Sequence, residues 1–111
     1  MEKNTKKVIQ SETFKQKRRE IYNYGSDAFG EFLADLFFER LKKILLELEY
    51  QYDLHPECKH LPTKGKIYRN IIFGKYLVIY RITIERVEIL TLVHSSRSVK
   101  KIKATRSIKI V

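Results

Sequence analysis

The chain has 111 residues, of which 43% are hydrophobic and 32% charged. This length suits one domain with a core of its own, and the apolar fraction excludes an intrinsically disordered protein. The formal net charge is +10. Residues 1–26 carry seven Lys and Arg against three acids, residues 27–57 three against eight, and residues 58–111 thirteen against two. We therefore expect the C-terminal half to attract a polyanion or an acidic protein, the alternative being a solvated Lys-rich surface.

Cysteine usage and hydropathy bear on the compartment. Cys58 is the single cysteine of the chain, so an internal disulfide framework is excluded and a reducing compartment is favoured. No apolar run approaches the 18 residues of a membrane span, and the Lys-rich N-terminus lacks the apolar centre of a signal peptide. The sequence predicts a cytoplasmic protein and indicates no cofactor.

The first half of the chain reads as a short strand followed by two helices. Residues 6–11 suit an edge strand, and Ser11 is a plausible N-cap for a helix over 12–24. Gly25-Ser26-Asp27 is expected to end this helix and to cap a second one over 27–50. The two would form an antiparallel helical hairpin. Apolar residues of the second helix recur at three- and four-residue spacing: Phe29, Leu33, Leu36, Phe37, Leu41, Ile44, Leu45 and Leu48.

The second half changes to a period of two. Residues 51–65 hold both prolines and form a loop, after which three β-branched and aromatic stretches predict strands. The strands span 66–73, 76–84 and 87–94, with tight turns at Gly74-Lys75 and Glu85-Arg86. The order β-α-α-β-β-β predicts an α+β fold, an antiparallel sheet with the helical hairpin on one face. We expect one domain over 1–111, ending in a basic amphipathic tail over 99–111 that forms a short helix or an edge strand.

Two-residue turns set the register of the predicted sheet. They place Arg69 opposite Tyr80, Tyr68 opposite Arg81, and Leu77 opposite His94, and directly paired residues share a face. One face is the better core: Ile71, Phe73, Tyr76, Val78, Tyr80, Ile82, Val87, Ile89 and Val93, with Arg69 and Thr91. The other face mixes apolar and polar groups and suits a binding surface: Tyr68, Asn70, Ile72, Leu77, Ile79, Arg81, Thr83, Glu88, Leu90, Leu92 and His94. A single bulge would exchange the two faces beyond it.

Two groups of residues are candidates for chemistry. His94 as general base, with Arg81 or Arg97 holding a phosphate, would form a catalytic site. The alternative is that His94 and Arg97 only make the end of a strand polar. The segment His55-Pro-Glu-Cys58-Lys-His60 has three zinc-ligand side chains, but no second half-site and no usual structural spacing. A polar loop is the better interpretation, so no metal site is predicted.

The predicted element order, with the stretch Tyr76-Leu-Val-Ile-Tyr80-Arg and the later Val87-Glu-Ile-Leu and Val93-His-Ser-Ser-Arg97, resembles the RelE/ParE superfamily of bacterial type II toxins. The resemblance implies a small basic toxin neutralised by a tightly bound cognate antitoxin. One branch of this superfamily cleaves mRNA on the ribosome, and the other inhibits DNA gyrase.

Three positions separate the branches. The ribosome-dependent nucleases usually have an arginine on the central strand at the position of Leu77, and lysines at the positions of Tyr68 and Asn70. Without these cations little remains to stabilise the pentavalent phosphate. The departures favour a ParE-like toxin that binds gyrase. The alternatives are an mRNA endoribonuclease that uses Arg81, His94 and Arg97, and an antitoxin-binding module without toxicity.

The resemblance also implies binding surfaces. An acidic, partly disordered antitoxin segment would bury Leu77, Ile79, Leu90 and Leu92, or would cover the helical hairpin. Cations and polar groups would contact a nucleic acid or another target: Lys64, Lys66, Tyr68, Arg69, Arg81, Lys100, Lys101 and Lys103. We expect a hetero-oligomer with the antitoxin.

Overall fold

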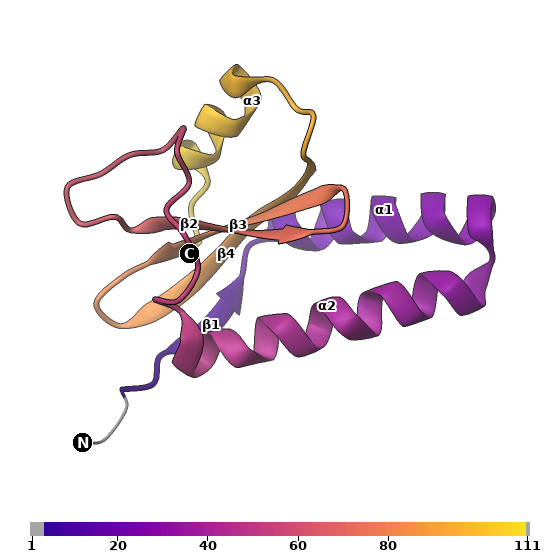
Figure 1. Ribbon diagram of the computed structural model, residues 1–111, viewed down its shortest axis with the longest axis horizontal. Coiled ribbons are helices and arrows are strands. Elements are labelled where there is room, and N and C mark those ends of the chain that lie inside the picture. The colour runs from indigo at the N-terminus through magenta and orange to yellow at the C-terminus, as the bar shows by residue number, and fades with distance from the viewer. Residues whose placement is uncertain (1–3, 111) are drawn as a thin grey trace.

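A computed structural model describes residues 4–110, so Val111 of the predicted tail lies outside the described residues. Two long helices lie on one face of a four-stranded sheet, and a long loop and the C-terminal segment lie on the other (Figure 1). The elements are β1 (Lys7–Gln10), α1 (Glu12–Phe29), α2 (Glu31–Gln51), β2 (Tyr68–Phe73), β3 (Tyr76–Ile82), β4 (Arg86–His94), α3 (Val99–Lys103) and the 3-10 turn η1 (Ala104–Ser107). The predicted α+β class and element order are confirmed. Among residues 4–110, no helix is long and apolar enough to cross a membrane.

The start of α1 is where the sequence predicts it, because Ser11 caps the helix. Its hydroxyl oxygen accepts a hydrogen bond from the Phe14 N–H at 2.9 Å, which satisfies one of the free N–H groups of the first turn. The same hydroxyl donates to the Leu90 carbonyl at 2.6 Å. The cap therefore ties the beginning of α1 to β4.

The end of α1 differs from the prediction. The helix continues through Gly25-Ser26-Asp27 to Phe29, and the chain reverses at Gly30, whose φ is 90°. Glycine adopts this conformation without the steric penalty that other residues meet. A glycine inside a helix costs about 1 kcal/mol relative to alanine. Contacts between the helices offset this cost: Tyr22 of α1 packs on Phe38 of α2 and donates its hydroxyl to Asp35 at 2.6 Å.

Two glycine substitutions test where the hairpin reverses. Gly30→Ala is expected to lower the free energy of unfolding by about 1–3 kcal/mol, because alanine would be held at a positive φ. The added Cβ meets no atom within 4 Å, so the effect comes from the backbone alone. Gly25→Ala is the matched control and is expected to raise stability by up to about 1 kcal/mol, as in any helix interior. Urea unfolding measures both, and the opposite pattern would place the reversal at Gly25.

The sheet has the order β1-β4-β3-β2. The register between β2 and β3 is confirmed, with Arg69 opposite Tyr80 and Tyr68 opposite Arg81. β1 differs from the predicted antiparallel arrangement, since it pairs in parallel with β4. It remains at the edge of the sheet, as predicted.

The register between β3 and β4 differs from the prediction in two ways. The turn lies one residue earlier, so that Ile82 pairs with Val87 and Arg81 with Glu88. This shifts the pairing by two residues and keeps every side chain on its predicted face. A bulge then inserts Leu90, since Tyr80 pairs with Ile89 but Ile79 with Thr91. From there on the faces are exchanged, and His94 pairs with Tyr76 instead of Leu77.

Each face of the sheet carries its own buried cluster. Against the helices, Val78, Tyr80 and Ile89 pack on α1 and α2, and the Tyr80 hydroxyl donates to the Tyr52 carbonyl at 2.6 Å. The helix residues of this cluster are Phe14, Leu41, Leu45 and Leu48. Against the loop and the tail, the second cluster comprises Cys58, Leu61, Tyr68, Ile79, Leu90 and Ile102. Because of the bulge, Leu92 lies in the first cluster and Val93 packs on the second.

Candidate partner-binding surfaces

Arg81 lies in an ion-pair network at the edge of the second sheet face. Its Nε donates to Glu88 Oε1 at 2.7 Å, and Arg86 Nε donates to Glu88 Oε2 at 2.8 Å. Arg81 Nη1 reaches the Tyr68 hydroxyl at 3.3 Å. Glu88 is only 4% exposed, so its carboxylate is held by two guanidinium groups in place of water.

The network shifts the pKa of both partners. Burial alone would raise the pKa of Glu88, but hydrogen bonds from Arg81 and Arg86 outweigh it and hold the pKa below the ordinary value. For Arg81, burial opposes the charge, yet the hydrogen bonds with Tyr68 and Glu88 raise the pKa. Both groups are therefore charged throughout the physiological range.

The C-terminal segment is fixed by the same arginines. Arg81 Nη2 donates to the Ile108 carbonyl and Arg86 Nη2 to the Ile110 carbonyl, each at 3.1 Å. Ile102 of α3 is buried in the second cluster. The tail forms the short helix that was one of its two predicted conformations, and it covers the sheet face expected to be a binding surface (Figure 1).

The three predicted catalytic residues do not lie together. His94 pairs with Tyr76, at the opposite end of β3 from Arg81, and its ring contacts Tyr76 at 5.6 Å between centroids. Tyr76 packs on the helix-side cluster, so the predicted shared face of His94 and Arg81 is wrong because of the bulge. His94 Nδ1 lies 2.7 Å from Ser96 Oγ. Arg97 is exposed just beyond β4.

The predicted target-binding residues fall into two groups. Arg69 is occupied within the fold, since its guanidinium donates to the carbonyls of Lys66, Asp53 and His55. Tyr68 is buried. The lysines of this prediction are all exposed on the loop and tail: Lys64, Lys66, Lys100, Lys101 and Lys103.

The predicted antitoxin-binding leucines and isoleucine are not at the surface of the described structure. Ile79, Leu90 and Leu92 are fully buried, and Leu77 is partly buried beside the second cluster. Leu92 faces the helices, on the opposite side from Leu90. The bulge and the covering tail are the physical reasons for the difference. The segment with potential zinc ligands also packs inward: Cys58 is buried, which raises its pKa, and the His55 ring contacts Tyr80.

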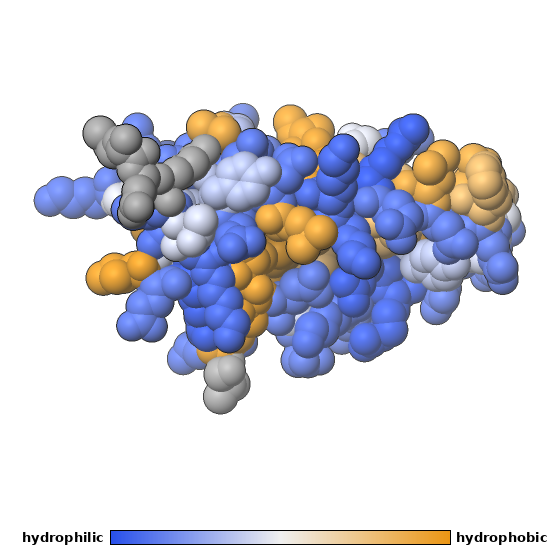
Figure 2. All heavy atoms as spheres, turned by 90° about the horizontal axis from the view of Figure 1, so that it is seen from below, coloured by the Kyte–Doolittle hydropathy of each residue, from blue (hydrophilic) through white to orange (hydrophobic). Residues whose placement is uncertain are grey.

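The tip of the helical hairpin exposes a large apolar surface, which we call the hairpin patch. It consists of Tyr24, Phe29, Phe32, Leu33 and Leu36, with Phe32 79% and Phe29 66% exposed. Figure 2 shows hydrophobic side chains gathered at this end of the molecule. A hollow of about 320 Å³ lies in the patch, with Phe29, Leu33 and Phe37 in its wall. Contiguous exposed apolar surface of this kind marks interaction sites.

The sequence contains a signal for the hairpin patch. Six apolar residues fall within 29–37, five of them large, which is too many for one helical stripe. The buried stripe of α2 contains Ala34 and then Leu41, Leu45 and Leu48. Phe29, Leu33 and Leu36, which were expected in this stripe, are exposed.

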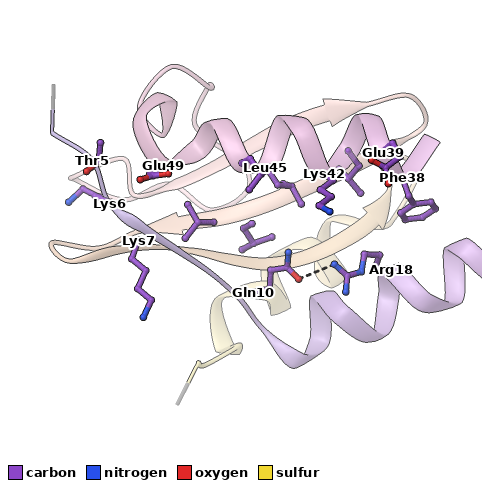
Figure 3. A pocket seen from close by; sticks show the side chains of 14 residues that line it. Thr5, Lys6, Lys7, Gln10, Arg18, Phe38, Glu39, Lys42, Leu45 and Glu49 are labelled. Atoms are coloured by element: carbon purple, nitrogen blue, oxygen red, sulfur yellow. Dashed lines mark hydrogen bonds between the residues drawn. The ribbon is translucent and has the colours of Figure 1, made fainter. Parts of the chain in front are cut away.

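A second hollow, the α2–β1 groove, has a volume of about 800 Å³ (Figure 3). Val8, Leu41 and Leu45 contribute apolar walls. Lys42, Glu39 and Glu49 line the groove from α2. Lys6 Nζ donates to the carbonyls of Thr83 and Ile84, and Arg18 donates to Gln10. The Lys7 side chain points away from α2 (Figure 3). Among residues 4–110, β1 pairs with β4 alone, so its outer edge is open to another strand. Sequence reasoning missed this groove, since it is assembled from segments some 30 residues apart.

Comparisons with known proteins agree with this architecture. A model of the ParE toxin of the type II toxin-antitoxin system parDE matches residues 8–99. A solved structure of the chromosomal ParDE toxin-antitoxin system from P. aeruginosa has the same fold: the TM-score is 0.67 at 11% identity, over 82% of this chain and 97% of that chain. No curated protein matches the sequence.

The two helices on a four-stranded sheet, with the family match over most of the chain, define a toxin of the RelE/ParE superfamily. The predicted resemblance is thereby confirmed. The chain belongs to the ParE toxin family of type II toxin-antitoxin systems.

Proposed function

We propose that this toxin inhibits growth by binding DNA gyrase and that a cognate antitoxin neutralises it. The choice between a gyrase inhibitor and an mRNA nuclease rests on the positions and partners of the cationic side chains on the sheet. Arg81 is held by Glu88 and by the tail, and His94 lies on the other face. The position of the nuclease arginine is Leu77. Within residues 4–110 the sheet therefore offers no preorganised group of cations for a pentavalent phosphate, and such electrostatic stabilisation usually dominates phosphoryl chemistry.

An expression experiment with two readouts tests this function. Expression in a sensitive host is expected to stop growth with a DNA-damage response and intact mRNA, and the purified protein is expected to block supercoiling of relaxed plasmid by gyrase. Rapid loss of mRNA with normal supercoiling would instead support the endoribonuclease, especially if Arg81→Ala and His94→Ala each abolish cleavage. Normal growth would instead support the third alternative, an antitoxin-binding module that is not toxic.

For the antitoxin, we propose binding across the hairpin patch and the α2–β1 groove. A partly disordered acidic segment loses conformational entropy when it binds, so it needs apolar surface whose burial offsets this loss. It also needs cations that pair with its acidic side chains. The hairpin patch offers exposed Phe29 and Phe32. The groove offers the exposed Lys42 beside its apolar walls, and the exposed Lys7 lies on the adjoining strand β1. The open edge of β1 would let an extended segment add a strand.

A further inference from the structure

The layer that covers the second sheet face is formed by two segments, 58–66 and 97–110, which we call the tail layer. The two lie side by side, since Arg106 Nη2 donates to the Pro62 carbonyl at 3.4 Å. Leu61 from the loop and Ile102 from α3 share one buried cluster. Figure 1 shows this layer across the sheet from α2. Because Arg81 and Arg86 hold the end of the tail, the layer is a fixed surface.

The tail layer carries almost the whole net charge of the protein. It has nine Lys and Arg and no Asp or Glu, and all nine are exposed: Lys59, Lys64, Lys66, Arg97, Lys100, Lys101, Lys103, Arg106 and Lys109. Over residues 12–51, which hold both long helices, seven cations face eight acids. Among the described residues, none of the nine takes part in an ion pair. Arg106 donates to Pro62 and lies over the Tyr68 ring, and the charge of the other eight is directed at solvent.

The side chains between these cations indicate what the layer binds. Val99 is the one strongly exposed large hydrophobic residue of the described part of the layer, so a segment that folds on binding finds little apolar surface to bury. The layer has no exposed Phe, Tyr or Trp among these residues, whereas binding of single strands relies on aromatic stacking. Exposed cations without stacking groups suit the paired phosphate backbones of a duplex.

We propose that the tail layer binds the phosphate backbone of duplex DNA without reading its sequence. α3 and η1 contribute Lys100, Lys101, Lys103 and Arg106 from one short stretch, and the loop contributes Lys64 and Lys66. The family match ends at residue 99, so most of these tail cations lie beyond it. This binding is separate from inhibition of gyrase and would hold for a toxin with any target.

Fluorescence anisotropy with a labelled 20-bp duplex, at 50 to 300 mM NaCl and without gyrase, tests the proposal. The wild type is expected to bind, with an association constant that falls linearly with salt on logarithmic axes. The triple substitution Lys100→Gln, Lys101→Gln, Lys103→Gln is expected to weaken binding on the order of tenfold or more at 100 mM salt and to reduce the slope by about 2 to 3. These side chains are exposed, and circular dichroism checks that the variant is folded.

The matched control removes three exposed cations from the helical layer, all outside the α2–β1 groove: Arg19→Gln, Arg40→Gln and Lys43→Gln. It is expected to retain DNA affinity within about threefold and to retain the wild-type slope. An equal loss in both variants would show that net charge alone acts and would overturn the site. Tighter binding to single strands than to the duplex, or no binding at 50 mM salt, would overturn it as well. Since gyrase is absent, none of these outcomes bears on the proposed target.

Discussion

Replacing Glu88 by glutamine is expected to lower the free energy of unfolding at pH 7 by about 3 kcal/mol. The substitution removes the buried carboxylate and leaves the charges of Arg81 and Arg86 without their counterion. Glu88 holds Arg81 and Arg86, and both arginines hold the carbonyls of the tail. The loss would therefore include the docking of the C-terminal segment. Urea unfolding measures the effect on stability. Faster hydrogen exchange at the Ile102 amide would show that the C-terminal segment is docked less firmly.

The control for this substitution is Glu20→Gln. Glu20 pairs with Lys17 at 3.8 Å on the exposed face of α1, where an ion pair contributes only about 0–1 kcal/mol. A loss at Glu88 no greater than the loss at Glu20 would mean that the network does not stabilise the fold.

The lowered pKa of Glu88 also makes stability depend on pH. The folded state binds its proton less readily than the unfolded state does, so the stabilisation is complete above the ordinary glutamate pKa of 4.5. It is lost as the pH falls through 4.5 and on through the lower pKa of the folded protein. Glu88→Gln is therefore expected to flatten the fall in stability below pH 5. Parallel curves for the wild type and the variant would contradict this.

The double substitution Phe29→Glu and Phe32→Glu is expected to weaken antitoxin binding about 100-fold or more, because exposed aromatic anchors dominate such interfaces. Two carboxylates would in addition repel an acidic segment. The side chains are 66% and 79% exposed, so the fold is expected to remain intact. Calorimetry with the cognate antitoxin measures the affinity. In cells, the variant is expected to stay toxic and to escape rescue by the antitoxin.

The control for the hairpin patch uses Ile72→Glu and Ile84→Glu. Both isoleucines are exposed, at 73% and 94%. Ile72 lies in β2 and Ile84 in the turn between β3 and β4, both outside the patch. Their antitoxin affinity is expected to stay within about threefold of the wild type. Unchanged affinity of the Phe29/Phe32 variant would remove the hairpin patch from the proposed interface, while rescue would still depend on the α2–β1 groove.

The parts of the fold that depend on local rules follow from the order of residues alone. The Ser11 cap, the two long helices and the β2–β3 register rest on side chains within a few residues of one another. A two-residue turn restricts the register of the strands that it joins. Counting outward from Gly74-Lys75 therefore gives every residue pair of that hairpin correctly. The family resemblance also came from the sequence, because its motif lies within adjacent strands.

Tertiary structure decided what depends on the balance of distant contacts. The bulge at Leu90 has no local signature, yet it moves His94 to the face opposite Arg81. The reversal at Gly30 rather than Gly25 depends on contacts between the two helices, where Tyr22 packs on Phe38 and donates to Asp35. Similarly, the tail buries Ile79 and Leu90 because Arg81, Arg86 and Glu88 meet at its end. A one-residue shift exchanges sheet faces, so the location of a binding surface follows from packing, which the order of residues alone does not reveal.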